Sequence, residues 1–137
     1  MPGPKPDTAD MSARLKRRKI LVVDDDDDIR DSMMLALQAE GAVVSEAADG
    51  NEAAAALLAA VPDAIVLDLM LPGLSGFLVL EEAKALQPRP IVVMVTANEG
   101  RRHESYAKAQ GVDGYLTKPT PLALLVDQLV DLLDARS

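Results

Sequence analysis

The sequence contains no cysteine and no tryptophan, and its only histidine is His103. Without cysteine, the chain has no disulfides, no thiol nucleophile and no thiolate metal site. No apolar run approaches the roughly 18 residues that a membrane-spanning helix needs. The polar, proline-containing N-terminus also lacks the apolar stretch of a signal peptide. These absences fit a reducing compartment, and we expect a cytoplasmic protein with no membrane contact, in which His103 is a surface residue rather than a metal ligand.

The net charge of −8 is unevenly distributed along the chain. Residues 1–19 hold six Lys or Arg and two Asp, whereas residues 20–137 hold eight Lys or Arg and twenty Asp or Glu. Residues 20–137 therefore carry a net charge of −12, which repels nucleic acid, and we expect no direct nucleic-acid binding. Residues 1–18 are rich in proline and small polar residues without periodicity, which predicts a disordered basic leader.

A length of 137 residues allows one domain with a sizeable core. From residue 19 onwards, short β-branched runs alternate with helical patterns. The predicted strands cover residues 20–24, 43–47, 64–68, 91–96 and 113–117. The predicted helices cover about 27–40, 50–60, 75–86, 99–109 and 120–134. Because the strands are almost continuously apolar, both faces of the sheet must be covered, which predicts an α/β fold with a parallel sheet between helices.

Polar residues stand where these strands end: Asp24 and Asp25 after the first, Asp68 after the third, Thr96 after the fourth and Lys118 after the fifth. Asp68 alone is equally compatible with a helix cap or a turn. In an open parallel sheet, however, the carboxyl ends of the strands form the ligand site. Crowded carboxylates repel one another unless a cation lies between them. All-oxygen ligands suit Mg²⁺, with Mn²⁺ as the alternative.

Taken in order, these motifs resemble the receiver domain of two-component response regulators, the family that includes the chemotaxis protein CheY. The matching segments are ILVVDD at 20–25, DLMLPGLSG at 68–76, VTA at 95–97 and YLTKP at 115–119, and the similarity covers residues 19–134. The resemblance implies a flavodoxin-like, CheY-like (βα)5 three-layer sandwich with a parallel sheet in the order 2-1-3-4-5. Residues 135–137 would then be the C-terminal end beyond the domain.

The resemblance also implies a role for each residue of the acidic site. Asp68 would accept a phosphoryl group from a phosphohistidine and would also be a metal ligand. Asp25 would coordinate Mg²⁺ directly, Asp24 mainly through water, and Met70 through its backbone carbonyl. The Lys118 ammonium would supply further positive charge.

The remaining implied roles concern the phosphoryl group and the output. The Thr96 hydroxyl and the Ala97 amide would donate hydrogen bonds to the phosphoryl oxygens. Thr96 would be coupled to Tyr115, which moves inward on phosphorylation and changes the surface of the fourth predicted helix, the fifth strand and the fifth helix. The bond between Lys118 and Pro119 is expected to be cis, as in the family.

Several positions depart from the family or leave a choice open. Thr120 stands where many members have Phe. The run of five Asp would let Asp26 exchange roles with Asp25 if the first strand ended one residue later. Met70 and Asn98 flank the site, where the family tunes the lifetime of the phosphorylated state.

The expected function is a phosphorylation-activated switch. Its partners would be a histidine kinase or histidine phosphotransfer protein and a downstream effector protein, and it would catalyse only its own phosphorylation and dephosphorylation. With three residues after 134, we expect a stand-alone regulator, as a monomer or a phosphorylation-dependent homodimer. The alternative is a binding module that acts without phosphorylation. A haloacid dehalogenase-type phosphatase is disfavoured, because its motif needs a second Asp at position 70, where this chain has Met.

Overall fold

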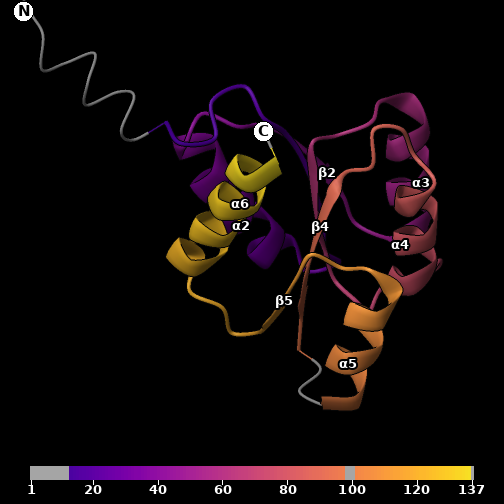
Figure 1. Ribbon diagram of the computed structural model, residues 1–137. Helices are drawn as coiled ribbons and strands as arrows, with labels where there is room; N and C mark the ends of the chain where they lie inside the picture. The colour runs from indigo at the N-terminus through magenta and orange to yellow at the C-terminus, as the bar shows by residue number, and fades with distance from the viewer. Residues whose placement is uncertain (1–12, 98–100, 137) are drawn as a thin grey trace, which may run out of the picture.

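A five-stranded parallel sheet forms the centre of the molecule (Figure 1). The computed structural model describes residues 13–97 and 101–136. The strands are β1 (Lys19–Val23), β2 (Val43–Ala47), β3 (Ala64–Leu67), β4 (Ile91–Thr96) and β5 (Gly114–Thr117). They lie in the order β2-β1-β3-β4-β5, so the predicted fold class and strand order are confirmed.

Helices cover both faces of this sheet. They are α2 (Asp27–Ala39), α3 (Gly50–Ala59), α4 (Gly76–Lys84), α5 (Arg101–Gln110) and α6 (Leu122–Arg136). Figure 1 shows α2 and α6 on one side of the sheet and α3, α4 and α5 on the other. None of the helices in the described ranges is both long and apolar enough to cross a membrane.

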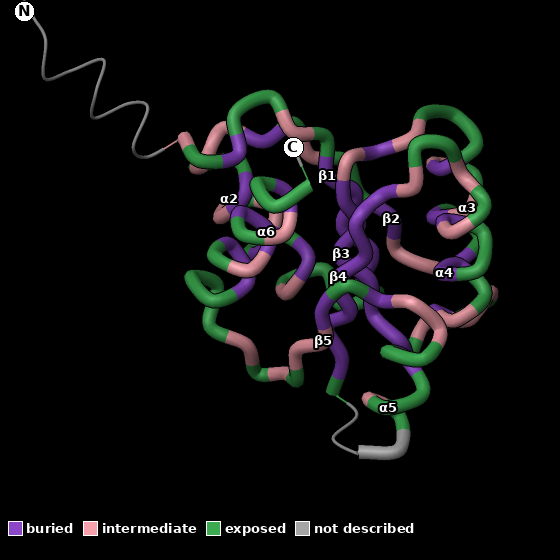
Figure 2. Tube along the Cα trace, in the orientation of Figure 1, coloured by how far each residue is buried: buried purple, intermediate pink, exposed green. Residues whose placement is uncertain are grey.

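The core is divided into two layers by the sheet, because neighbouring side chains of a strand point to opposite faces. Val22 and Val66 pack in the cluster that contains side chains of α2 and α6. Leu21 and Ile65 pack in the cluster that contains side chains of α3, α4 and α5. Every residue of β3 and β4 is buried, as the purple strands in Figure 2 show. The central strands are therefore fixed from both sides, which holds their carboxyl ends in place.

Two glycines allow the segment after β3 to pack closely. A Cβ atom on Gly76 would lie 2.5 Å from the carbonyl oxygen of Asp68, and one on Gly50 would lie 1.8 Å from that of Leu74. Both distances are far below an ordinary contact between nonbonded atoms. The segment between Asp68 and α4 thus packs closely against the first residue of α4 and the first residue of α3.

The predicted N-terminal leader, residues 1–18, extends too far into the chain. Residues 13–18 belong to the packed domain: Leu15 is 1% exposed and lies in the core cluster of α2 and α6. Arg14 forms ion pairs with Glu40 at 3.3 Å and with Asp127 at 3.0 Å. The reason is that one leucine within a basic stretch finds an apolar site between two helices, a long-range contact that local composition does not reveal.

Residues 1–12 of the predicted leader, and Asn98 and Ser137, lie outside the described residues. At the other end of the chain, α6 continues to Arg136, two residues beyond its predicted end. Residues 135 and 136 are therefore part of the last helix rather than a segment beyond it.

Candidate functional site

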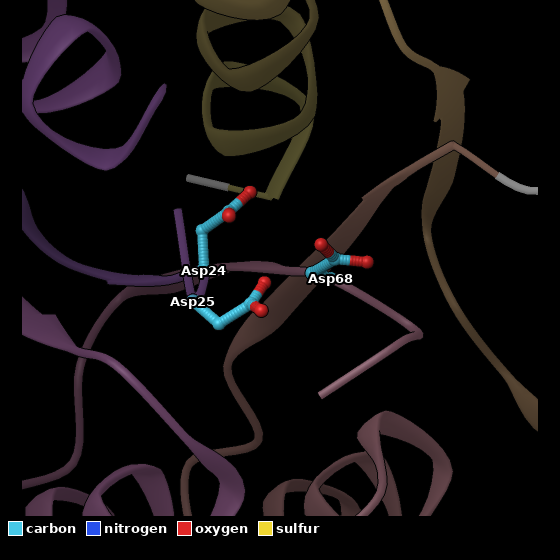
Figure 3. Close-up of side chains that lie close together, drawn as sticks. All are labelled: Asp24, Asp25 and Asp68. Carbon is cyan, nitrogen blue, oxygen red and sulfur yellow. The ribbon is translucent and has the colours of Figure 1, made fainter. Parts of the chain in front are cut away.

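Three carboxylates meet at the carboxyl ends of β1 and β3 (Figure 3). Asp24 and Asp25 follow β1, and Asp68 follows β3. One carboxylate oxygen from each lies within 4.8 Å of the others. Asp24 and Asp68 are buried, with exposures of 0% and 4%, whereas Asp25 is exposed. Two of the three negative charges are therefore shielded from water. Repulsion between like charges is stronger in the protein interior than in water.

The backbone explains why these side chains converge. The Asp24 amide donates to the carbonyl of Ala47, at 3.2 Å, and the Asp68 amide donates to the carbonyl of Val23, at 3.0 Å. The hydrogen-bond pattern of the sheet therefore continues one residue beyond the strands. Both acids are held at a fixed position on the rigid sheet.

Lys118, just after β5, supplies the positive charge in this cluster. Its Nζ atom lies 2.7 Å from Asp24 Oδ2 and 2.8 Å from Asp68 Oδ2. Burial by itself would lower the pKa of Lys118, but the short contacts with the two carboxylates outweigh burial and raise it. The Lys118 amide also donates to the Thr96 carbonyl at 2.8 Å, and its bond to Pro119 is cis. The lysine is thus a charged residue that bridges two buried acids.

One buried acceptor in the cluster has an ion pair but no hydrogen bond. Asp24 Oδ2 is buried and has no hydrogen-bond partner among the described residues. The ammonium of Lys118 is close enough to it for an ion pair, but the contact does not have the angles of a hydrogen bond. A buried carboxylate oxygen without a hydrogen bond is costly unless a cation binds it. The cluster could bind a metal ion, because it brings three carboxylates together and their oxygen donors fit a hard divalent cation.

The neighbouring residues settle which acids belong to the cluster. Asp26 caps α2, and its carboxylate accepts from the amide of Ile29 at 3.0 Å. The Asp26 amide donates to Asp24 Oδ1 at 2.9 Å, so the loop turns around Asp24. The first strand ends at Val23, and Asp25 rather than Asp26 lies with Asp24 and Asp68. The sequence pattern predicts a cap at Asp27 or Asp28, and this is wrong: both lie inside the first turn of the helix, and any Asp in a run of five can occupy the cap position.

The residues around Asp68 are also held in place by the ends of the strands. The Met70 amide donates to Asp68 Oδ1 at 2.9 Å, and the Met70 side chain is 62% exposed. Thr96 is fully buried at the end of β4, and Ala97, which follows it, is exposed. Ala97 and Lys118 also line a cleft of about 610 Å³ between α2 and α6. The predicted metal, phosphoryl and acceptor residues thus lie at or next to the carboxyl ends of the strands, whereas Tyr115 lies within β5.

Tyr115 lies on β5 opposite Met94, two residues before the position paired with Thr96. Its side chain is partly buried and packs against the cluster on the α3, α4 and α5 face. Burial raises the pKa of the Tyr115 hydroxyl, and the negative charge of Glu104 on α5 raises it further.

We expect the Tyr115 hydroxyl to titrate above its ordinary value of about 10. The Tyr106→Phe variant leaves Tyr115 as the only tyrosine, so its ionisation is followed directly by phenolate absorbance. Glu104→Gln in that background should lower the pKa part of the way, because it removes the charge but leaves the burial. Titration at or below the ordinary value would contradict the placement of Tyr115 against the core.

Arg30 is a residue that the sequence patterns did not single out. It is 8% exposed, although it lies on a helix at the surface of the fold. Its position three residues before Met33 and seven before Leu37 places it in line with the buried stripe of α2. A charged residue at a buried position of an amphipathic helix is the sequence signal that could have identified Arg30.

Comparisons with known proteins agree with this geometry. The family model for the response regulator receiver domain matches residues 20–130. The probable transcriptional regulatory protein TcrX of Mycobacterium tuberculosis is 36% identical over 103 residues, which are 75% of this chain and 44% of TcrX. The chain spans less than half the length of the curated relatives it matches.

Solved structures show the same fold. A CheY-like receiver domain from Methanospirillum hungatei is 31% identical with a TM-score of 0.82, covering 88% of this chain and 96% of that one. The BeF3-activated DrrB receiver domain is 28% identical with a TM-score of 0.79, covering 86% and 98%. The chain therefore belongs to the response regulator receiver domains of two-component signalling, a CheY-like family of signalling domains rather than enzymes.

Proposed function

We propose that this chain is a phosphorylation-controlled switch in which Asp68 accepts a phosphoryl group from a histidine kinase or a histidine phosphotransfer protein. The observation that carries this proposal is the ammonium of Lys118 between Asp24 and Asp68, next to the exposed carboxylate of Asp25. Such a site combines a fixed carboxylate nucleophile with positive charge for an incoming phosphate. The similarity to the BeF3-activated DrrB domain supports it, because beryllofluoride mimics a phosphoryl group on a carboxylate.

The transfer would proceed by attack of an Asp68 carboxylate oxygen on the phosphorus of the donor phosphohistidine. A phosphorus–oxygen bond forms while the phosphorus–nitrogen bond breaks, and its electron pair passes to the imidazole, which takes a proton from solvent. The bond from the Met70 amide to Asp68 Oδ1 holds the carboxylate in one orientation. Lys118 can follow the developing charge, because its ammonium already contacts Asp68 Oδ2.

The metal and the phosphoryl contacts would come from residues around Asp68. Asp24, Asp25, Asp68 and the backbone carbonyl of Met70 would hold Mg²⁺, which when bound would offset the charge of the transferring group. The Thr96 hydroxyl and the Ala97 amide, at the end of β4, would donate hydrogen bonds to the phosphoryl oxygens. Ala97 is exposed and small, so that a phosphate can approach its backbone.

Output would pass from Thr96 to Tyr115 and then to the surface of α5, β5 and α6. Tyr115 is partly buried and lies in the strand next to that of Thr96, so an inward movement of its ring would repack this surface. The phosphate would select one of two existing arrangements by binding it more tightly. We infer that the changed surface binds an effector protein, and that the chain acts in the cytoplasm with its kinase.

The test is the intact mass of the protein after incubation with acetyl phosphate, in Mg²⁺ or in excess chelator. We expect one phosphoryl group per chain in Mg²⁺ and little or none in chelator. An adduct that forms equally well in chelator would argue against the metal site. Absence of any adduct in Mg²⁺ would instead favour a receiver that binds its partner without phosphorylation.

A further inference from the structure

Arg30 connects three segments around the acidic site. Its guanidinium donates from Nη1 to the backbone carbonyl of Asp24 at 2.7 Å, from Nε to Glu46 at 2.8 Å and from Nη2 to Asp27 at 2.6 Å. Glu46 belongs to β2 and Asp27 to the first turn of α2. Only 10% of the Arg30 side chain is exposed, whereas the side chains of Asp27 and Glu46 are 80% and 51% exposed. The buried guanidinium thus connects the Asp24 carbonyl to two carboxylates at the surface, and its ion pairs with these carboxylates hold it in place.

The contact with the Asp24 carbonyl is the one that bears on the site. The Asp24 amide is held by Ala47 and one carboxylate oxygen by the Asp26 amide. The carbonyl held by Arg30 belongs to the peptide unit that joins Asp24 to Asp25. With that carbonyl fixed, the orientation of this peptide is fixed, and with it the direction from which Asp25 enters the cluster.

We infer that Arg30 is a positioning residue for the metal half of the site, through its hydrogen bond to the Asp24 carbonyl. This inference rests on the proposed function in so far as the acidic cluster holds Mg²⁺. Arg30 acts through the backbone of the ligand loop and does not itself touch the metal or the phosphoryl group. Groups that orient metal ligands in this way typically contribute 10–100-fold to metal affinity.

A purely electrostatic role for Arg30 predicts the opposite result. A positive charge near a cation site repels the cation, so its removal alone would tighten Mg²⁺ binding. Loss of a positioning contact would weaken binding instead. The sign of the change in Mg²⁺ affinity therefore separates the two roles. Replacement with lysine separates them again. Lysine keeps the charge but lacks the planar guanidinium that reaches three acceptors, so it preserves an electrostatic role and not a positioning role.

The experiment is a Mg²⁺ titration of the full chain, followed by backbone amide NMR shifts, for wild type, Arg30→Met and Arg30→Lys. We expect the dissociation constant to rise about 10–100-fold in Arg30→Met and to rise clearly in Arg30→Lys. In the metal-free state, the amide signals of Asp25 and its neighbours should already differ from those of wild type. The matched control is Arg14→Met, which also removes an arginine bound to two carboxylates, but at a place without site residues, and should leave Mg²⁺ affinity unchanged.

Tighter binding in Arg30→Met, or wild-type affinity in Arg30→Lys, would overturn the inference. If Arg30→Met does not fold, as its amide spectrum would show, Arg30→Lys decides the question, because it retains the charge and most of the stem. The titration needs no phosphodonor. A wild type that binds Mg²⁺ but forms no acyl phosphate would contradict the proposed function while leaving the role of Arg30 testable.

Discussion

Replacement of Asp68 with asparagine should abolish the phosphoryl adduct formed from acetyl phosphate in Mg²⁺. The amide oxygen of asparagine carries no charge and is a poor nucleophile, and the change also removes the ion pair with Lys118 at 2.8 Å. No other carboxylate in the cluster has the same surroundings, because Asp24 is fully buried and Asp25 is exposed. Intact mass spectrometry of the variant, at times that saturate the wild type, measures the loss.

The matched control for this experiment is Asp31→Asn. Asp31 is an exposed acid on α2, so its replacement changes the net charge equally while leaving the cluster intact. It should form the adduct as wild type does. A full adduct on Asp68→Asn would show that another residue accepts the phosphoryl group, and mapping of the modified peptide would identify it.

The Lys118→Met variant should lose stability in chelator and regain much of it in Mg²⁺. Methionine leaves the buried carboxylates of Asp24 and Asp68 without the ammonium that bridges them. Removal of one partner from a buried ion pair typically costs about 3–5 kcal/mol. A divalent cation can neutralise the same two carboxylates, so Mg²⁺ should stabilise the variant more than it stabilises the wild type.

Urea unfolding of both proteins, with Mg²⁺ and with chelator, measures this difference. Asp24→Asn added to Lys118→Met should recover part of the lost stability in chelator, because it removes one of the two unpaired charges. Equal stabilisation of the two proteins by Mg²⁺ would contradict the prediction. It would mean that the lysine and the metal do not act on the same carboxylates.

The sheet and the acidic site were predictable because local sequence determines both. The apolar runs of β1, β3 and β4 are buried as strands, and the polar residue that follows each run marks its carboxyl end, as with Asp68 after β3. In a parallel sheet these ends lie on one edge, so separate motifs such as those of Asp24 and Lys118 meet without further information. The cis bond before Pro119 came from the family resemblance rather than from local physics.

Arg30 and Leu15 were missed for a different reason. The burial of Arg30 depends on Glu46, which is sixteen residues away on another strand, and on a backbone carbonyl that no sequence pattern marks. Leu15 depends on an apolar site formed by helices from opposite ends of the chain. Long-range partners decide both positions, whereas composition and periodicity describe only near neighbours.

The placement of Leu15 means that the unit that folds is longer than the unit that sequence similarity recognises. The family model begins at residue 20, yet Leu15 is 1% exposed and Arg14 bridges Glu40 and Asp127. A protein cut at the similarity boundary would leave part of the surface between α2 and α6 uncovered. The proper start of this domain for expression, crystallisation or fusion to another protein therefore lies at residue 13 or earlier.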